Sequence, residues 1–158
     1  GHSVTWIHAG LLKEFSRNDI RMDLIGRVYS SNLQHVERGR ANGRSVTITS
    51  IGKTLNNAVR AGSVTDAENV IHELRSAVNE LHGVGVAHCD ICTDNMFVLE
   101  DGTIILGDLE YCTESDNLPP QVRRFYGTPA TALELDEMQV LRCNDDIRAM
   151  MAPITTRK

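Results

Sequence analysis

The clearest pattern of apolar and polar positions in the chain predicts a helix over residues 66–82. Its apolar residues recur at helical spacing and form one wide face, made of Val70, Ile71, Leu74, Ala77, Val78 and Leu81. Thr65 can cap the start of this helix, with Glu68 three residues later as in a capping box. Gly83 follows the last turn and can adopt the left-handed conformation that ends many helices. The sequence therefore predicts both ends of this helix and the face that it buries.

Shorter patterns on either side of this helix alternate between strand and helix. Those before it predict a strand over residues 4–15, a helix over residues 18–32, a turn-rich break around residues 39–43 and a strand over residues 46–51. Those after it predict a strand over residues 96–99, a turn at residues 100–102, a returning strand over residues 103–106 and a helix over residues 132–151. This mixture predicts an α+β domain.

Length and composition are those of one ordinary globular domain. The chain has 158 residues, of which 41% are hydrophobic and 23% are charged, enough for a single core. The net charge of -5 argues against nucleic acid as a partner, because nucleic-acid-binding domains are usually basic. No apolar run is long enough to cross a membrane, and residues 1–13 lack the apolar core of a secretion signal. We expect no membrane partner, and an intracellular location is favoured although the compartment stays open.

The four cysteines allow two interpretations. Cys89 and Cys92 form a C-x-x-C pair, and a zinc site would add Cys112 and His88. The chain has no second C-x-x-C or H-x-x-H pair to complete such a site, and Cys143 stands apart. The sequence therefore favours reduced, partly buried thiols over a zinc site.

The candidate chemistry lies around the turn at residues 100–102. Antiparallel pairing about this turn brings Asn95 and Asp108 side by side where the two strands separate. Asp90, on the preceding polar loop, can reach the same region. Taken singly, each aspartate is best explained as a solvated loop residue, but the combination favours a site. Amide and carboxylate oxygens suit Mg²⁺, which also takes oxygens from substrate phosphates.

The same residues resemble the protein-kinase family. The stretch H-C-D-I-C-T-D-N, from His88 to Asn95, is similar to the kinase catalytic loop H-R-D-x-x-x-x-N except for Cys89. Asp108-Leu109-Glu110 stands where kinases carry D-F-G, and the helix before the loop ends in L-H-x-x-G-V-x-H. The resemblance implies a reduced kinase-like fold, with a partial N-lobe and hinge over residues 4–52 and a truncated helical C-lobe over residues 53–158.

The resemblance also implies roles for individual residues. Asp90 would be the catalytic base, and Asn95 and Asp108 would hold the Mg²⁺ ions that bridge the phosphates of ATP. His88 would be structural, packing the loop against Asp108. Glu110 replaces the glycine of D-F-G and would restrict movement of that segment.

Farther from this loop the resemblance rests on shorter segments. G-L-L-K-E-F resembles the V-A-I-K strand, so Lys13 would contact the α and β phosphates, with a surface lysine as the alternative. The acidic partner of that lysine would come from the following helix, with Asp23 as the first candidate and Asp19 as the second. The remaining matches are residues 51–55 with the hinge, residues 126–129 and 133–134 with the end of an activation segment, and Asp146 with the start of the next helix.

The departures from the family pattern keep several functions open. The sequence has no glycine-rich loop before Lys13, and Cys89 replaces the arginine of the catalytic loop. These features favour a pseudokinase, a binding or regulatory module whose open helical surface is covered by a protein partner or a second copy. An active ATP-dependent phosphotransferase is the alternative, because Asp90, Asn95 and Asp108 are all present. A metal-dependent hydrolase that uses the same carboxylates is a third.

Overall fold

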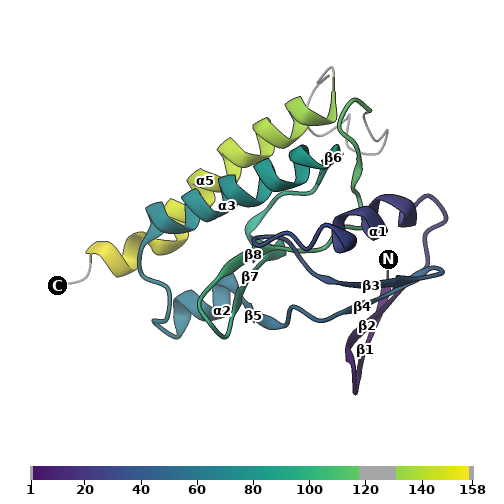
Figure 1. The fold of residues 1–158 in the computed structure, drawn as a ribbon. Helices are drawn as coiled ribbons and strands as arrows, with labels where there is room; N and C mark the ends of the chain where they lie inside the picture. Colours follow the sequence, from purple (N-terminus) through teal and green to yellow (C-terminus); the bar gives the residue numbers. More distant parts are fainter. Residues whose placement is uncertain (1, 118–130, 157–158) are drawn as a thin grey trace.

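The computed structural model describes residues 2–117 and 131–156 of the chain, with side chains as far as residue 152. Its helices and strands form the mixed α+β arrangement that the sequence predicts. Figure 1 shows two long helices on one side of a central hairpin and a four-stranded sheet with a short helix on the other.

The N-terminal sheet is antiparallel throughout, with the strand order β1-β2-β4-β3. Its strands are β1 (His2–Ile7), β2 (Gly10–Phe15), β3 (Gly39–Asn42) and β4 (Ser45–Ile48). Alternation along β4 sends Val46 and Ile48 into the core. There they join the buried face of helix α1 (Met22–Ser30), formed by Leu24, Ile25, Val28 and Tyr29. The sheet and α1 thus share one core.

The first hairpin corrects the prediction of a single strand over residues 4–15. The chain forms two strands there, joined by a turn at His8 and Ala9. Gly10 has a φ of +143°, and a Cβ atom at this position would lie 2.3 Å from the carbonyl oxygen of Ile48. Only glycine fits such a close approach between strands. The weak alternation of apolar residues over 4–15 does not reveal the turn that precedes it.

Other predicted boundaries near the sheet are also wrong. The first helix begins at Met22 and not at residue 18. The predicted break around residues 39–43 is largely strand β3, and the turn is confined to residues 43–44. The strand predicted over residues 46–51 ends at Ile48, because the following backbone N–H groups bond to Arg38. The residues expected to form a hinge become strand β5 (Gly52–Thr54), followed by helix α2 (Leu55–Arg60).

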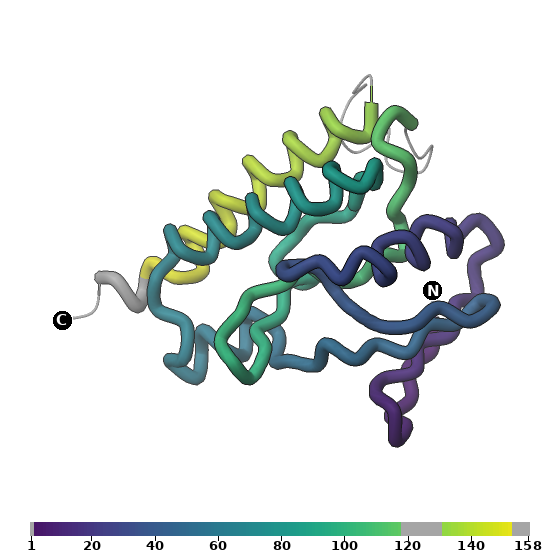
Figure 2. Tube along the Cα trace, in the orientation of Figure 1, coloured from purple at the N-terminus to yellow at the C-terminus, as the bar shows by residue number. Residues whose placement is uncertain are grey.

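Helices α3 (Ala67–Gly83) and α5 (Ala132–Thr156) lie side by side, as Figures 1 and 2 show. The predicted apolar face of α3 is buried, apart from Ile71, which is half-buried. The core that it shares with α5 includes Val140, Ile147 and Met151. The predicted helix over residues 132–151 is therefore confirmed, although it continues to Thr156.

The ends of α3 differ from the prediction by small shifts. Asp66, and not Thr65, caps its start, and the Asp66 carboxylate accepts a hydrogen bond from Asn69 N at 3.2 Å. Gly83 is the last helical residue, while Gly85 takes the left-handed conformation with a φ of +79°.

Of two assignments beyond the central hairpin, one stays a prediction and the other is wrong. Leu133 and Glu134, expected at the end of an activation segment, lie in the first turn of α5. Asp146, expected to begin a helix, lies in the middle of α5. The match at residues 126–129 falls outside the described residues. In the described parts of the chain, none of the helices combines the length and apolarity required to cross a membrane.

The central hairpin consists of β7 (Met96–Leu99) and β8 (Ile104–Leu106), with β5 paired on the outer side of β7. Its register pairs Met96 with Leu106, which places Asn95 across from Gly107 as predicted. Gly107 N donates a hydrogen bond to Asn95 O at 2.7 Å, so the pairing continues to the open end. Strands β6 (Val86–Ala87) and β9 (Thr113–Glu114) pair beyond it.

Candidate functional site

His88 joins the polar loop to the residue before Asp108. Its imidazole is fully buried, and Nδ1 accepts a hydrogen bond from Asp90 N at 3.0 Å. Because Nδ1 is the acceptor, the proton of the neutral ring is on Nε2, which donates to Gly107 O at 2.7 Å. His88 therefore has the structural role expected for it, between the loop and the hairpin.

Asn95 and Asp90 are held together at the open end of the hairpin. Asn95 is the last residue of the short 3-10 helix η1 (Thr93–Asn95), directly before β7, and its side chain points back toward the loop. Nδ2 donates to Asp90 O at 2.8 Å and to Asp90 Oδ2 at 3.1 Å. Both bonds come from the nitrogen, so Oδ1 is the atom of Asn95 that can bind a cation.

Lys13 lies in the same region, although it comes from the N-terminal sheet. Its side chain is buried in the middle of β2, and Nζ lies 3.8 Å from Asp108 Oδ1. The alternative of a surface lysine is wrong, because only 7% of the residue is exposed. An ammonium group buried to this extent requires an anionic partner nearby, and Asp108 supplies it.

Backbone strain marks the two motifs. Cys89 and Asp108 have φ values of +70° and +57°, in the left-handed region that residues with a Cβ atom rarely adopt. Strained backbone of this kind is found most often at functional sites, where the surrounding contacts stabilise it. Here one strained residue lies in each of the two segments that carry the candidate chemistry.

Glu37 is part of the site but was missed in the sequence. It lies between α1 and β3, and only 5% of it is exposed. Oε1 accepts a hydrogen bond from Asp108 N at 3.1 Å, and Oε2 accepts one from Tyr29 Oη at 2.5 Å. Burial and the charge of Glu37 raise the pKa of the Tyr29 hydroxyl, so that it stays a donor.

The position of Glu37 depends on contacts that no local pattern reveals. Val36 forms a parallel bridge with Leu106, which brings the next residue against the end of β8. A Cβ atom at Gly107 would lie 3.2 Å from Glu37 Oε1 and 2.9 Å from the ring of Phe97. The glycine at position 107 therefore gives the Glu37 carboxylate room to reach the Asp108 backbone.

The structure does not bring Asp23 or Asp19 to Lys13. Asp23 lies in the first turn of α1 with its side chain 64% exposed, and its carboxylate pairs with Arg21 at 3.0 Å. The hydrogen bond from Arg21 lowers the pKa of Asp23. Asp19 pairs with Arg17 at 2.9 Å, outside the helix. Both carboxylates therefore pair with neighbouring arginines and not with the buried Lys13.

Helix α5 fixes the polar loop from the other side. Asp136 is fully buried, and its carboxylate accepts hydrogen bonds from Cys89 N at 2.8 Å and His88 N at 3.0 Å. His82 Nε2 lies 2.7 Å from the same carboxylate. One turn later, Gln139 accepts from Ile91 N at 2.8 Å through Oε1 and donates to Cys89 O at 3.0 Å. These contacts satisfy backbone groups that would otherwise be buried without partners.

Neither anchoring residue was predicted, although a weak signal existed. Asp136 and Gln139 lie three residues apart in α5, among the buried residues Leu135 and Val140. Polar residues on the buried side of a helix require hydrogen-bond partners, which is the feature that could have identified them.

The electrostatics of the site favour a bound cation. The ammonium group of Lys13 pairs with Asp108 and lines one cavity with Glu37, and the charges of Asp108 and Glu110 act on the nearby Asp90. Burial raises the pKa of Asp90 above its ordinary value of 3.8, and His88 and Asn95 oppose this shift while Asp108 and Glu110 add to it. A phosphate group would be repelled from such a site unless a divalent cation came with it.

A metal ion here would require ligands from outside the protein. No group of three or more His, Cys, Asp or Glu side chains in the described parts of the chain is arranged to hold an ion. Asn95 Oδ1 and the Asp108 carboxylate are the atoms that could hold Mg²⁺, with the remaining positions left to phosphate oxygens and water.

The thiols lie close to the site without forming a second one. Cys89, Cys112 and Cys143 are buried, Cys92 is half-buried, and all four are free. Burial raises the pKa of Cys89 and Cys92, and raises those of Cys112 and Cys143 to about 12. Zinc binds thiolates, and these environments favour the protonated thiol.

A cavity of about 250 Å³ opens beside Lys13. Its apolar wall comes from both the sheet and the hairpin and includes Trp6, Leu11, Ile48, Phe97 and Ile105. Lys13 and Glu37 form its polar end. The cavity therefore adjoins Asp108 through Lys13 and Glu37, which both contact that residue.

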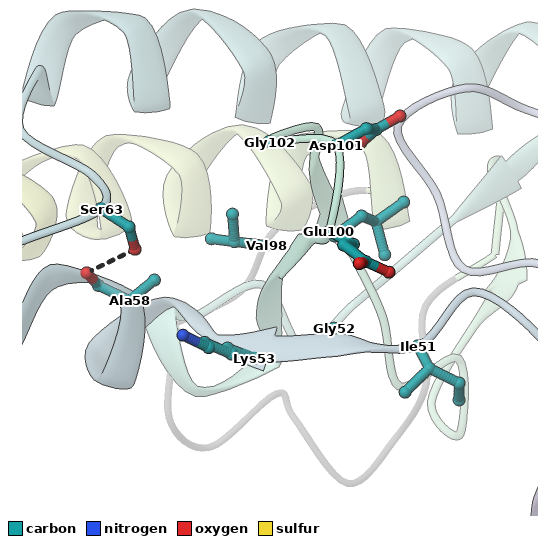
Figure 3. Close-up of a pocket in the computed structure, with 10 residues that line it drawn as sticks. Ile51, Gly52, Lys53, Ala58, Ser63, Val98, Glu100, Asp101 and Gly102 are labelled. Carbon is teal, nitrogen blue, oxygen red and sulfur yellow. Dashed lines mark hydrogen bonds between the residues drawn. The ribbon is translucent and has the colours of Figure 1, made fainter. Parts of the chain in front are cut away.

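A second pocket, of about 500 Å³, lies at the other end of the hairpin (Figure 3). It is lined by the turn that carries Glu100 and Asp101 and by Lys53 of β5. In Figure 3 the acidic side chains and the Lys53 ammonium group point in different directions, so no charged group converges there. This pocket shares Ile51 and Gly52 with the first cavity, whereas Asn95 and Asp108 lie at the opposite end of β7 and β8.

Lys13 and Asp108 thus form one contacting pair, and Asn95 and Asp90 form another. His88 joins the loop of the second pair to the residue before Asp108. Glu37, Asp136 and Gln139 hold the surrounding backbone. Comparison of the chain with protein-family models and with curated proteins gives no match.

Proposed function

We propose that the chain is a protein-kinase-like domain that binds a nucleotide together with Mg²⁺ and acts as a binding or regulatory module. The observation that carries this proposal is the ion pair between Lys13 and Asp108, at 3.8 Å, next to the bonded pair of Asn95 and Asp90. These residues come from distant parts of the sequence, and the sequence predicted each of them for one site.

The two ends of the site would bind different parts of the nucleotide. The apolar cavity suits a base, and Lys13 can contact phosphate oxygens at the polar end. Asn95 and Asp108 would hold Mg²⁺, which neutralises phosphate charge when bound. Glu37 holds the backbone of Asp108, and His88 holds the loop against Gly107, so both ligands are positioned before the nucleotide arrives.

The order of the elements also supports the kinase-like assignment. A strand with a lysine is followed by a helix, three strands, a short helix and a long helix. The polar loop, the central hairpin and a second long helix come after them, with the short strands β6 and β9 before and after the loop and hairpin. This is the order that the resemblance implies for a reduced kinase domain.

Phosphate transfer is the second candidate function. Asp90 favours it, because its carboxylate is oriented by Asn95 and its pKa is raised by burial, as expected for a group that accepts a proton. Labelling of an acceptor from radioactive ATP that disappears in Asp90→Ala would support transfer. Equal labelling by the wild type and the variant would contradict it.

Thermal unfolding with and without Mg-ATP tests the proposed binding. At a ligand concentration of about 100 Kd, binding adds about 2.7 kcal/mol to the free energy of unfolding, which should raise Tm by about 5 °C or more. The rise should vanish with EDTA and in Asp108→Asn. It should persist in Asp116→Asn, which removes an exposed carboxylate outside the site. An equal rise in both variants, or none in the wild type, would contradict the proposal.

A further inference from the structure

The single tryptophan of the chain lies at the mouth of the cavity. Trp6 is in β1, directly across from Leu11 of β2, which lies across from Ile48 of β4. Directly paired residues of neighbouring strands project from the same face of a sheet. Trp6, Leu11 and Ile48 therefore form one row, and all three line the cavity.

The exposure of Trp6 is unusual for its position. The residue is 67% exposed, whereas Ile48 at the other end of the row is buried. A large aromatic side chain that stays exposed beside an apolar cavity indicates a surface for binding. Phe97 and Ile105 of the hairpin form the facing wall, so the indole can cover a flat group placed between them.

The polar end of the cavity indicates which ligand has this flat group. Lys13 follows Leu11 by two residues along β2, which separates their positions by about 7 Å. A sugar can span this distance between a base next to Leu11 and phosphates next to Lys13. The row thus matches a ligand with an aromatic heterocycle at one end and phosphates at the other.

We propose that Trp6 stacks on the base of a bound nucleoside di- or triphosphate and so selects nucleotides over other phosphate compounds. This inference rests on the proposed function and adds to it the part of the ligand that is recognised. The exposed indole closes the cavity over the base. Stacking makes the affinity for the ligand depend on its aromatic ring. Every base has a flat face that can stack, so the stacking does not distinguish one base from another.

A second copy of the chain is the competing occupant of this surface. β1 is the edge strand of its sheet, and Val4 and Ile7 are also exposed. Pairing of two β1 strands would cover these residues together with Trp6. The charged groups of Lys13 and Asp108 favour the nucleotide as the ligand. Pairing of two β1 strands would use the backbone edge and would involve neither of these groups.

Intrinsic fluorescence offers a direct test, since Trp6 is the sole tryptophan. Wild-type protein is titrated with Mg-ATP and with Mg-tripolyphosphate, and nucleotide absorbance is corrected with N-acetyltryptophanamide. Mg-ATP should change the emission of Trp6 over the concentrations at which it raises Tm, whereas tripolyphosphate should leave the emission unchanged. A rise in Tm without any change in emission would overturn the stacking proposal and leave nucleotide binding intact.

Two other outcomes would also overturn it. If neither Tm nor emission responds to Mg-ATP, nucleotide binding itself fails and stacking fails with it. If the emission depends on protein concentration without ligand, the indole is covered by a second copy.

Substitutions provide an independent measurement. Trp6→Leu should weaken Mg-ATP binding roughly 10-fold in calorimetry, while Trp6→Phe should stay within about 3-fold of the wild type. Thr5→Ala is the matched control, because Thr5 is the exposed neighbour of Trp6 on the opposite face of β1 and does not line the cavity. Tripolyphosphate should bind Trp6→Leu and wild type equally. Undiminished Mg-ATP binding by Trp6→Leu would contradict the proposal.

Discussion

The polar loop over residues 88–95 and the first hairpin both face the candidate site, but they are held in different ways. The loop is partly buried and is bound from α5 by Asp136 and Gln139, and from the hairpin by Gly107. The β1–β2 hairpin is held to the molecule by its pairing with β4, and its outer strand is exposed. The comparison indicates that more contacts hold the polar loop than hold β1, so that substitutions in β1 should cost less folding stability.

The largest expected effect comes from removing the anchor of the loop. Asp136→Ala should lower the free energy of unfolding by about 3–5 kcal/mol, because it leaves His88 N and Cys89 N buried without acceptors. Urea denaturation measures the change. The neighbouring Glu137→Ala, which removes only an exposed pair with Arg75, should cost less than about 1 kcal/mol. Similar losses in the two variants would show that the loop does not depend on α5.

A smaller loss is expected where the two regions meet. Glu37→Ala should destabilise the fold by about 2 kcal/mol, because Tyr29 Oη and Asp108 N lose their common acceptor. Glu37→Gln keeps an acceptor oxygen and should cost less than half as much. Val4→Ala on the exposed hairpin is the comparison, with little change expected. Chemical denaturation of the three variants should reproduce this order, and a Val4→Ala loss equal to that of Glu37→Ala would contradict it.

Substitution of Asp90 should raise the folding stability, in contrast to the substitutions above. Its pKa is raised above 3.8 in the folded state, mainly by burial, so its ionisation destabilises the fold. Without metal, wild-type stability should fall as pH rises from 3.8 through the raised pKa, whereas Asp90→Asn should lack this component. The variant should therefore have the higher Tm at pH 7 in EDTA. A lower Tm would show that the charged form of Asp90 is stabilising.

The smallest effect concerns reactivity and not stability. A maleimide reagent should label Cys92 first in the native protein, because the other three thiols are buried. The labelling rate of Cys92 should increase with pH, since burial raises its pKa and the thiolate is the reactive form. Mass spectrometry after timed labelling checks the order. Early modification of Cys89 would show that the polar loop opens readily.

The sequence predicts the parts of this site that depend on local pattern. The register of the central hairpin follows from its turn, and that register places Asn95 across from Gly107. The helix that leads to the polar loop follows from its apolar periodicity. Lys13 follows from a resemblance of only a few residues, and the structure places it next to Asp108.

The remaining parts depend on contacts between distant segments. Glu37 follows no periodic pattern, and only the bridge between Val36 and Leu106 brings it to Asp108. Asp136 lies in a helix whose polar positions look solvated until α5 is packed against the loop. Asp23 pairs with its neighbour Arg21, whereas Lys13 pairs with Asp108, which is distant in the sequence.

Placing the bound metal directly is the most decisive measurement. Paramagnetic Mn²⁺ can replace Mg²⁺ in a titration of isotope-labelled protein with ATP, followed by the broadening of amide signals in NMR spectra. We predict broadening centred on Asn95, Gly107 and Asp108, at the open end of the hairpin. Broadening centred on Glu100 and Asp101 at its other end, or nucleotide binding with no broadening near Asp108, would contradict the proposed site.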